Sequence, residues 1–160
     1  EVEDGSDKEA RLAMANASLL AGVAFSNSMV GIVHAMGHAC GGVSRAPHGD
    51  CMTILLPYGM EYNLPAVSEY YARLLLPLAG AEVYADTPAS ERARKSIDTV
   101  REMTETYNRI CGLPTRLSEV GVKKDDLPKI ARAAINDGAI IVNPVEASES
   151  DVLGILEKAF

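Results

Sequence analysis

Apolar residues recur at helical spacing along most of the chain, and this periodicity predicts a series of amphipathic helices. Glycine, proline and capping residues separate the helical runs, and the expected stop signals include Gly112 and the triplet Asn136-Asp137-Gly138. The expected helices cover about residues 8–23, 31–39, 52–63, 66–79, 88–111, 126–135 and 149–160. Only one short apolar string, Ala139 to Val142, resembles a strand. The pattern therefore predicts an all-α fold class, with residues 1–160 forming one helical domain.

Three of the predicted helices begin with a recognisable starting signal. Ser6 or Asp7 is expected to cap the first helix with its side-chain oxygen. The Thr87-Pro88 pair combines a capping side chain with proline at the first helical position. Ser148, with Asp151 three residues later, resembles a capping box at the start of the last helix.

The first half of the chain carries the breaks and kinks on which the arrangement depends. The helix over residues 8–23 is expected to be buried on more than one side, because small residues fill the positions between its apolar ones. A break is predicted over residues 25–30, and the Gly41-Gly42 pair is expected to end the second helix. Pro57 is expected to kink the third.

Length and composition limit the class of protein. The 160 residues suffice for one domain with its own core. The formal net charge is −7 with dispersed acidic residues, so a surface for nucleic acid is not expected. No apolar segment reaches the length of a membrane span, and no signal-peptide pattern opens the sequence. Three cysteines without CxxC spacing favour a reducing, cytoplasmic setting.

All three histidines lie in one glycine-rich stretch, Gly31 to Pro57, with the sequence GIVHAMGHACGGVSRAPHGDCMTILLP. His34 and His38 are four residues apart, which places both imidazoles on one face of a helix. His48 follows at a turn and could fold back toward them. Three neutral imidazoles suit Zn²⁺ or Fe²⁺ with an open coordination position. The stretch is therefore a candidate metal or catalytic site, with packing or hydrogen-bonding histidines as the alternative.

Cys40 and Cys51 leave a second alternative, a structural zinc site of mixed histidine and cysteine ligands. Their spacing matches no common zinc pattern, and buried free cysteines usually pack as small apolar residues. The glycines form no phosphate loop, because neither GxxxxGK[ST] nor a strand followed by GxGxxG is present. The nearest carboxylates, Asp50 and Glu61, are expected to be solvated or paired.

The stretch resembles the signature of the iron-containing (group III) alcohol dehydrogenases. The pattern G-x2-H-x3-H-x2-G, then x6-H-G and LP, is met at every position. The segments ASLLAGVAFSNSMVG, LPYGMEYN, LPTRLSEVGV and NPVEASESDVLGILEKAF are similar to the same family in the same order, so the resemblance covers nearly the whole chain. It implies the C-terminal, all-α, metal-binding domain of a two-domain enzyme. The chain resembles most of this α domain only, so the α/β domain that holds NAD or NADP is expected to be missing, and the opening without Met raises the same expectation for the N-terminal side.

The resemblance also implies roles for individual residues. His34 and His48 correspond to metal ligands, and Phe25 to a residue that lines the apolar pocket beside the nicotinamide. His38 corresponds to a catalytic residue near the metal and the nicotinamide cofactor, where it helps relay the proton. The family's other two ligands come from a D-x3-H motif, which this chain lacks before Gly31, so half of the metal shell is expected elsewhere.

The implied activity is that of a metal-dependent, NAD(P)-linked alcohol dehydrogenase using Fe²⁺ or Zn²⁺. A small alcohol or aldehyde is the expected substrate, and the 160 residues alone are expected to be inactive. The expected partners are the N-terminal nucleotide-binding domain and further copies of the protein in a homo-oligomer, without nucleic acid or membrane. Two alternatives stay open: a relative acting on glycerol or a hydroxy acid, and a non-catalytic helical interaction domain.

Overall fold

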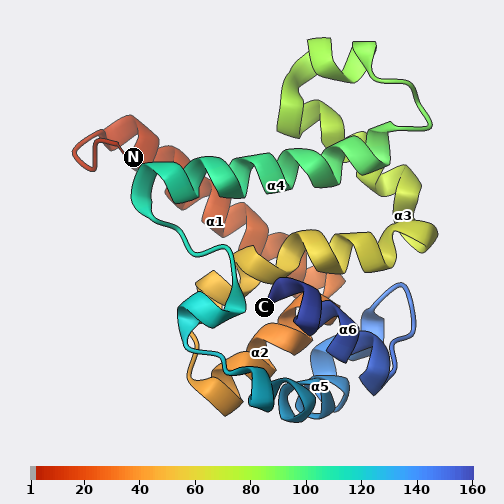
Figure 1. The fold of residues 1–160 in the computed structure, drawn as a ribbon. Helices are drawn as coiled ribbons and strands as arrows, with labels where there is room; N and C mark the ends of the chain where they lie inside the picture. Colours follow the sequence, from red (N-terminus) through yellow and green to blue (C-terminus); the bar gives the residue numbers. More distant parts are fainter. Residues whose placement is uncertain (1–2) are drawn as a thin grey trace.

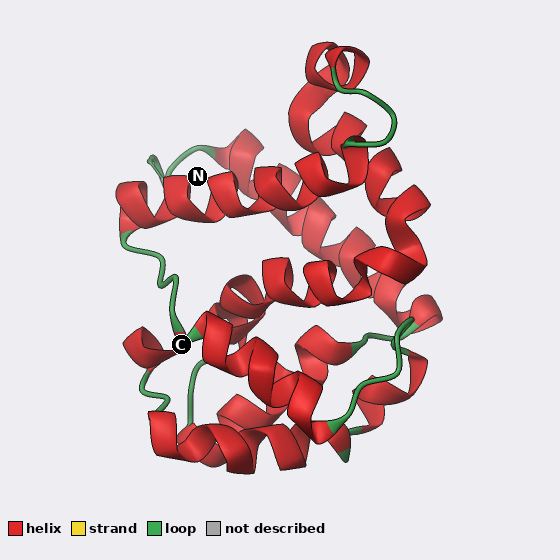
Figure 2. Ribbon diagram, turned by 45° about the vertical axis from the view of Figure 1, so that its right-hand side comes forward, coloured by secondary structure: helices red, strands yellow, loops and turns green. Residues whose placement is uncertain are grey.

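The computed structural model describes residues 3–160, and these residues form six α-helices and three short 3-10 helices without a strand (Figure 2). The α-helices are α1 (Lys8–Ser28), α2 (Ile32–Ser44), α3 (His48–Asp86), α4 (Arg92–Cys111), α5 (Leu127–Ile135) and α6 (Glu149–Ala159). The 3-10 helices are η1 (Leu117–Val120), η2 (Lys124–Asp126) and η3 (Gly138–Val142). The predicted all-α class is confirmed.

The helices form two connected groups, which Figure 1 shows one above the other. In the lower group α2 packs against α3 and α5, and α5 packs against α6. The long α3 leaves this group and bends, and α4 returns along it in the most extensive helix–helix contact of the structure (Figure 1). The core consequently lies in the lower group, around α2.

The buried apolar side chains of this core hold α2 in place from several sides. Ile32 and Met36 of α2 are at most 1% exposed, and they belong to one cluster with Leu55, Ile130 and Leu156 from α3, α5 and α6. Burying a side chain of this size contributes about 1.5–3 kcal/mol. Because α2 carries two of the three histidines, the core fixes the helix on which the candidate site is built.

α1 differs from the prediction in length and in burial. Asp7 caps its first turn as expected, but the helix runs to Ser28 instead of ending near residue 23. None of its residues is buried, and Leu19 and Leu20 are 67% and 68% exposed. The predicted burial on more than one side is wrong, because the apolar face of α1 meets no extensive surface among residues 3–160.

The C-terminal end of α2 departs from the prediction, whereas α3 bends close to predicted helix boundaries. α2 does not end at Gly41-Gly42, because both glycines keep helical hydrogen bonding and Arg45 makes the left-handed turn at φ 58°. The residues around Pro57 keep helical backbone angles, and the non-helical residues of α3, Val67 and Gly80, lie at the two ends of the helix predicted over residues 66–79. Gly80 has φ 88°, a conformation that glycine adopts without a Cβ penalty.

Thr87 ends one helix instead of starting the next. Its backbone N–H and its hydroxyl both donate to the carbonyl of Val83, at 3.0 and 2.6 Å, which closes α3. α4 begins only at Arg92, after a turn. Its end is as predicted, since Gly112 takes the left-handed conformation.

The string Ala139 to Val142 is part of η3, so the strand prediction is wrong. An isolated apolar string has no neighbouring strand to complete its backbone hydrogen bonds, and here the carboxylate of Asp137 accepts from the N–H of Ala139 at 2.8 Å and starts a helical turn. At α6 the capping box of Ser148 and Asp151 is confirmed.

No single described helix is both long and apolar enough to cross a membrane. α1 and α2 satisfy those criteria only when taken together, and the chain bends by 105° between them.

Candidate metal and catalytic site

The three histidines come together in one cluster. The ring centroids of His34 and His38 are 5.8 Å apart, and the ring of His48 lies 5.5 Å from each of them. α2 carries the first two histidines one turn apart, and His48 is the first residue of α3. Residues 45–47 therefore turn the chain back on itself, as the sequence suggested.

Burial differs among the three imidazoles. His34 is half-buried, whereas His38 and His48 are exposed. Burial, followed by the neighbouring imidazoles of His48 and His38, lowers the pKa of His34. A lowered pKa keeps His34 neutral at pH 7, which is the form of imidazole that coordinates a metal ion.

Asp137, at the start of η3, contacts His38 although the two residues are 99 positions apart in the sequence. The Nδ1 atom of His38 lies 3.0 Å from Oδ2 of Asp137, while Oδ1 of the same carboxylate accepts from the N–H of Ala139. Because an ionised carboxylate only accepts hydrogen bonds, this contact places the proton of a neutral His38 on Nδ1. The other ring nitrogen, Nε2, is then the one available to accept a proton.

Asn143 ties the other end of η3 to α2. Its Oδ1 accepts from the backbone N–H of Ile32 at 3.0 Å and from Nδ2 of Asn63 at 2.9 Å. Its Nδ2 donates to Oδ1 of Asn63 at 2.8 Å and to the carbonyl of Val145 at 2.7 Å. Since Asp137 and Asn143 flank η3, this short helix is anchored to the histidine-bearing helix at both ends.

Neighbouring side chains lie so close to α2 that two positions of the motif, Gly31 and Gly37, have no room for a Cβ atom. A Cβ atom on Gly31 would lie 2.7 Å from Oδ1 of Asn143, and one on Gly37 would lie 1.8 Å from the terminal methyl of Met52. Any larger residue at position 31 would displace the amide that caps α2. The glycines thus bring η3 and α3 against α2, as expected for residues without a side chain.

Cys40 and Cys51 belong to the apolar core. Both are free and fully buried. A hydrogen bond with Cys51, and then burial, raises the pKa of Cys40, so this thiol stays protonated. Within residues 3–160 no group of three or more His, Cys, Asp or Glu side chains is arranged to hold a metal ion, so the mixed histidine–cysteine zinc site finds no support.

Phe25 lies apart from the cluster. It sits in the last turn of α1, with 51% of its surface exposed. Among the described residues it makes no ring–ring contact with the three histidines. Its role beside a nicotinamide stays a prediction.

The sequence analysis missed Asp137 and Asn143. The first was seen only as part of a helix stop signal, and the second only as part of a segment similar to the family. The one available clue was that both polar residues flank the same apolar string. The contacts with His38 and Ile32 span 99 and 111 positions, a separation that local patterns do not encode.

The structure is thus an all-helical domain in which three imidazoles come together between α2 and the first residue of α3. All of residues 1–160 match the family model described as the C-terminal part of the Fe-containing alcohol dehydrogenase family. The chain therefore belongs to the iron-containing alcohol dehydrogenase family, and the resemblance noted from its histidine stretch is confirmed.

Curated relatives of known activity match almost the entire chain. A 1,3-propanediol dehydrogenase of Klebsiella pneumoniae is 37% identical over 156 residues, which are 98% of this chain and 39% of that protein. The NAD-dependent methanol dehydrogenase of Bacillus methanolicus is 36% identical over 160 residues, which are 99% of this chain and 40% of that protein. A lactaldehyde reductase of Escherichia coli is 36% identical over 154 residues, which are 96% of this chain and 39% of that protein.

The fold is also similar to solved structures. The crystal structure of a 1,3-propanediol oxidoreductase matches with a TM-score of 0.88 and 36% identity, over 98% of this chain and 39% of that one. An alcohol dehydrogenase from Oenococcus oeni matches with a TM-score of 0.83 and 34% identity, over 98% of this chain and 39% of that one. The chain thus spans about two fifths of the length of the relatives it matches.

Proposed function

We propose that this chain is the C-terminal, metal-binding part of an NAD(P)-linked alcohol dehydrogenase that interconverts small alcohols with aldehydes or ketones. The observation that carries the proposal is the convergence of His34, His38 and His48, with His38 held by Asp137. Relatives named for 1,3-propanediol, methanol and lactaldehyde support the substrate class. Residues 1–160 are proposed to form one helical domain, completed by sequence outside them.

The donor set fits Fe²⁺ or Zn²⁺, since neutral imidazole is a good ligand for both ions. His34 and His48 are the proposed ligands, and their rings lie 5.5 Å apart with His34 kept neutral by its environment. Two imidazoles are half of the four-ligand set that the family resemblance implies. The remaining two ligands are proposed to come from outside residues 1–160.

A bound metal supplies Lewis acidity toward the substrate oxygen, and NAD or NADP accepts or returns the hydride. The residues of this chain orient the reactants and move the proton. Nε2 of His38 is proposed to take up and return the proton, because Asp137 occupies Nδ1. Phe25 is proposed to form the apolar wall that keeps water from the nicotinamide, although its ring is exposed in these 160 residues.

The same proposal includes a homo-oligomeric enzyme in the cytoplasm, where the three free cysteines would stay reduced. The chain by itself is proposed to be inactive, since it spans only about two fifths of the length of its relatives.

Metal analysis of histidine variants in the intact enzyme tests these assignments. His48→Ala should remove bound metal and activity together, because it deletes a ligand. His38→Ala is the matched control on the same cluster and should retain most of the metal while losing rate. A normal metal content in His48→Ala would refute the ligand assignment, and complete metal loss in His38→Ala would make His38 a ligand.

Calorimetry on the 160-residue chain tests whether the metal site is shared. Weak or absent binding of Zn²⁺ and Fe²⁺ is expected, because only two ligands are present. Tight binding that His48→Ala abolishes would contradict the half-site, since a complete site would then exist within the chain or between two copies.

A further inference from the structure

A second candidate site lies between α3, α4 and the loop that follows α4. It is a hollow of about 380 Å³. One wall comes from α3 and the other from the C-terminal half of α4, with Thr115 and Arg116 at the end. The lining residues of α3 are Thr53, Ile54, Pro57 and Tyr58. None of the three histidines lines it, and the proposed alcohol dehydrogenase chemistry makes no use of it.

The face that α4 turns toward this hollow is polar. The lining residues of α4 follow helical spacing on one face: Arg101, Thr104, Glu105, Asn108 and Arg109. The large apolar residues of the same half of α4 do not line the hollow and are exposed: Met103, Tyr107 and Ile110. Glu105, Asn108 and Arg109 are exposed, so the hollow is an open, polar site that a dissolved ligand can reach.

The lining is positively charged although the chain as a whole carries −7. Arg101, Arg109 and Arg116 against Glu105 give a formal lining charge of +2. Among residues 3–160, Arg109 and Arg116 form no ion pair with a carboxylate. Glu119 lies nearby, but one of its carboxylate oxygens accepts from the backbone N–H groups of Thr115 and Arg116.

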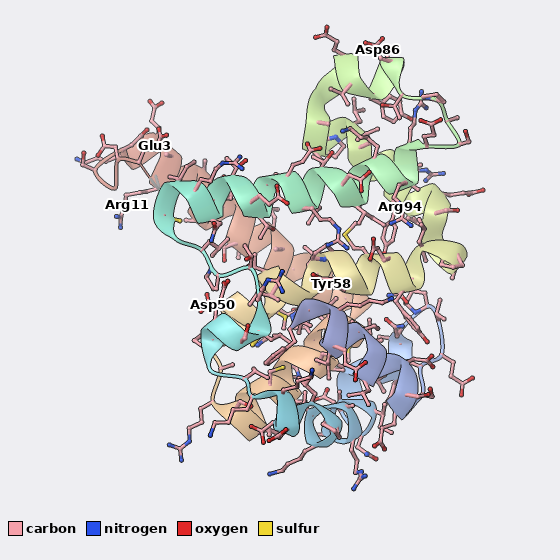
Figure 3. The ribbon with its side chains drawn as sticks, in the orientation of Figure 1. Glu3, Arg11, Asp50, Tyr58, Asp86 and Arg94 are labelled. Atoms are coloured by element: carbon pink, nitrogen blue, oxygen red, sulfur yellow. The ribbon has the colours of Figure 1, made fainter. Side chains whose placement is uncertain are left out.

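Two of the three guanidinium groups are already held in place. Arg101 lies 2.8 Å from Glu61 and 4.7 Å from the ring centroid of Tyr58, which Figure 3 labels on α3 below α4. Glu61 is itself shared with Arg94, so a single carboxylate serves two cations. Arg109 donates to the hydroxyl of Thr106 at 2.9 Å. Groups ordered before binding lose less entropy when a ligand arrives.

We propose that this arginine hollow, defined by Arg101, Arg109 and Arg116, binds a small multivalent oxyanion. Guanidinium groups recognise carboxylate and phosphate oxygens through paired N–H donors, and the hollow supplies three such groups around one space. Its volume is at the lower end of the range of about 300–1,000 Å³ for small-molecule sites. The proposed ligand class is therefore a di- or tricarboxylate or inorganic phosphate.

Isothermal titration of citrate and, separately, of inorganic phosphate into the protein tests the proposal at constant ionic strength. At least one anion should bind saturably, and the one that binds more tightly identifies the carboxylate or the phosphate source. Arg109→Gln and Arg116→Gln should each weaken that binding about tenfold, the equivalent of about 1.4 kcal/mol. Both side chains are exposed, so the fold should persist, which circular dichroism checks.

Arg73→Gln is the matched control, because Arg73 is exposed, carries the same charge and does not line the hollow. It should leave the affinity unchanged. Equal weakening by all three substitutions would overturn the proposal in favour of general charge attraction. The absence of saturable binding by either anion at millimolar concentration would overturn it as well.

Discussion

Replacing Asn143 by alanine tests how η3 holds the histidine-bearing helix. The side chain of Asn143 makes two hydrogen bonds with the buried amide of Asn63, one with the N–H of Ile32 and one with the carbonyl of Val145. Alanine removes all four at once. The substitution therefore detaches η3 from the first turn of α2, two residues before His34.

The expected cost follows from the groups left without partners. The amide of Asn63 is 7% exposed, and the N–H of Ile32 lies on a residue that is 1% exposed. A buried polar group without a partner costs about 1–3 kcal/mol, so these two groups together predict a loss of about 3 kcal/mol in the free energy of unfolding. In the Asn143→Ala background, Asn63→Ala should cost about 1–2 kcal/mol less than it does alone, because its partner is already gone.

Urea unfolding followed by circular dichroism measures both quantities. Asn136→Ala is a suitable control, because its exposed amide makes one local bond, to the carbonyl of Arg132 at 2.7 Å, and its loss should change stability by less than about 0.5 kcal/mol. Two results would contradict a stabilising role for the hydrogen bonds of Asn143. One is a stability change in Asn143→Ala as small as that of the control, and the other is additivity of the substitutions at Asn63 and Asn143.

Three further predictions concern other residues. In the intact enzyme Asp137→Asn should lower kcat about 10- to 100-fold with bound metal retained, because Asp137 positions His38. Asp137→Glu should recover part of the rate. An unchanged kcat in Asp137→Asn would exclude this positioning role. Folding lowers the pKa of His34, so the unfolded chain binds more protons than the folded chain near the ordinary histidine pKa of about 6.5. The free energy of unfolding of the metal-free protein should therefore fall as the pH decreases through that value. His34→Gln should flatten this pH dependence in urea titrations, and an unchanged slope would contradict the assignment. Ser148→Ala should cost about 1 kcal/mol in thermal or urea unfolding by removing the cap of α6, and a neutral effect would mean that the capping box contributes nothing.

Local sequence signals correctly predicted the helix ends that are capped by neighbouring residues. α5 stops at Ile135, where the Asn-Asp-Gly signal begins, and α6 starts directly after the capping box at Ser148. α4 ends at the predicted glycine. These features depend on residues within one turn of each other, so they can be predicted from a short segment of sequence.

The errors came from features that depend on distant surfaces. The small and apolar residues of α1 predicted burial, but burial requires an opposing surface, which residues 3–160 do not supply. The string Ala139 to Val142 has strand-like composition, yet its conformation is decided by the capping side chain of Asp137 and by contact with α2. For the same reason the histidine cluster was predictable from its spacing, whereas the residues that hold it were not.

The two anchors of η3 also set the order in which the site can be assembled. The contact of His38 with Asp137 joins residues 99 positions apart, and the hydrogen bond of Ile32 with Asn143 joins residues 111 positions apart. During synthesis the histidine stretch emerges long before either anchor, so its final geometry can form only after residues up to Asn143 have left the ribosome. Closing such long loops is entropically slow, and until then the apolar residues of α2 lack their covering helices. Chaperone binding in that interval would therefore protect the segment that later carries the chemistry.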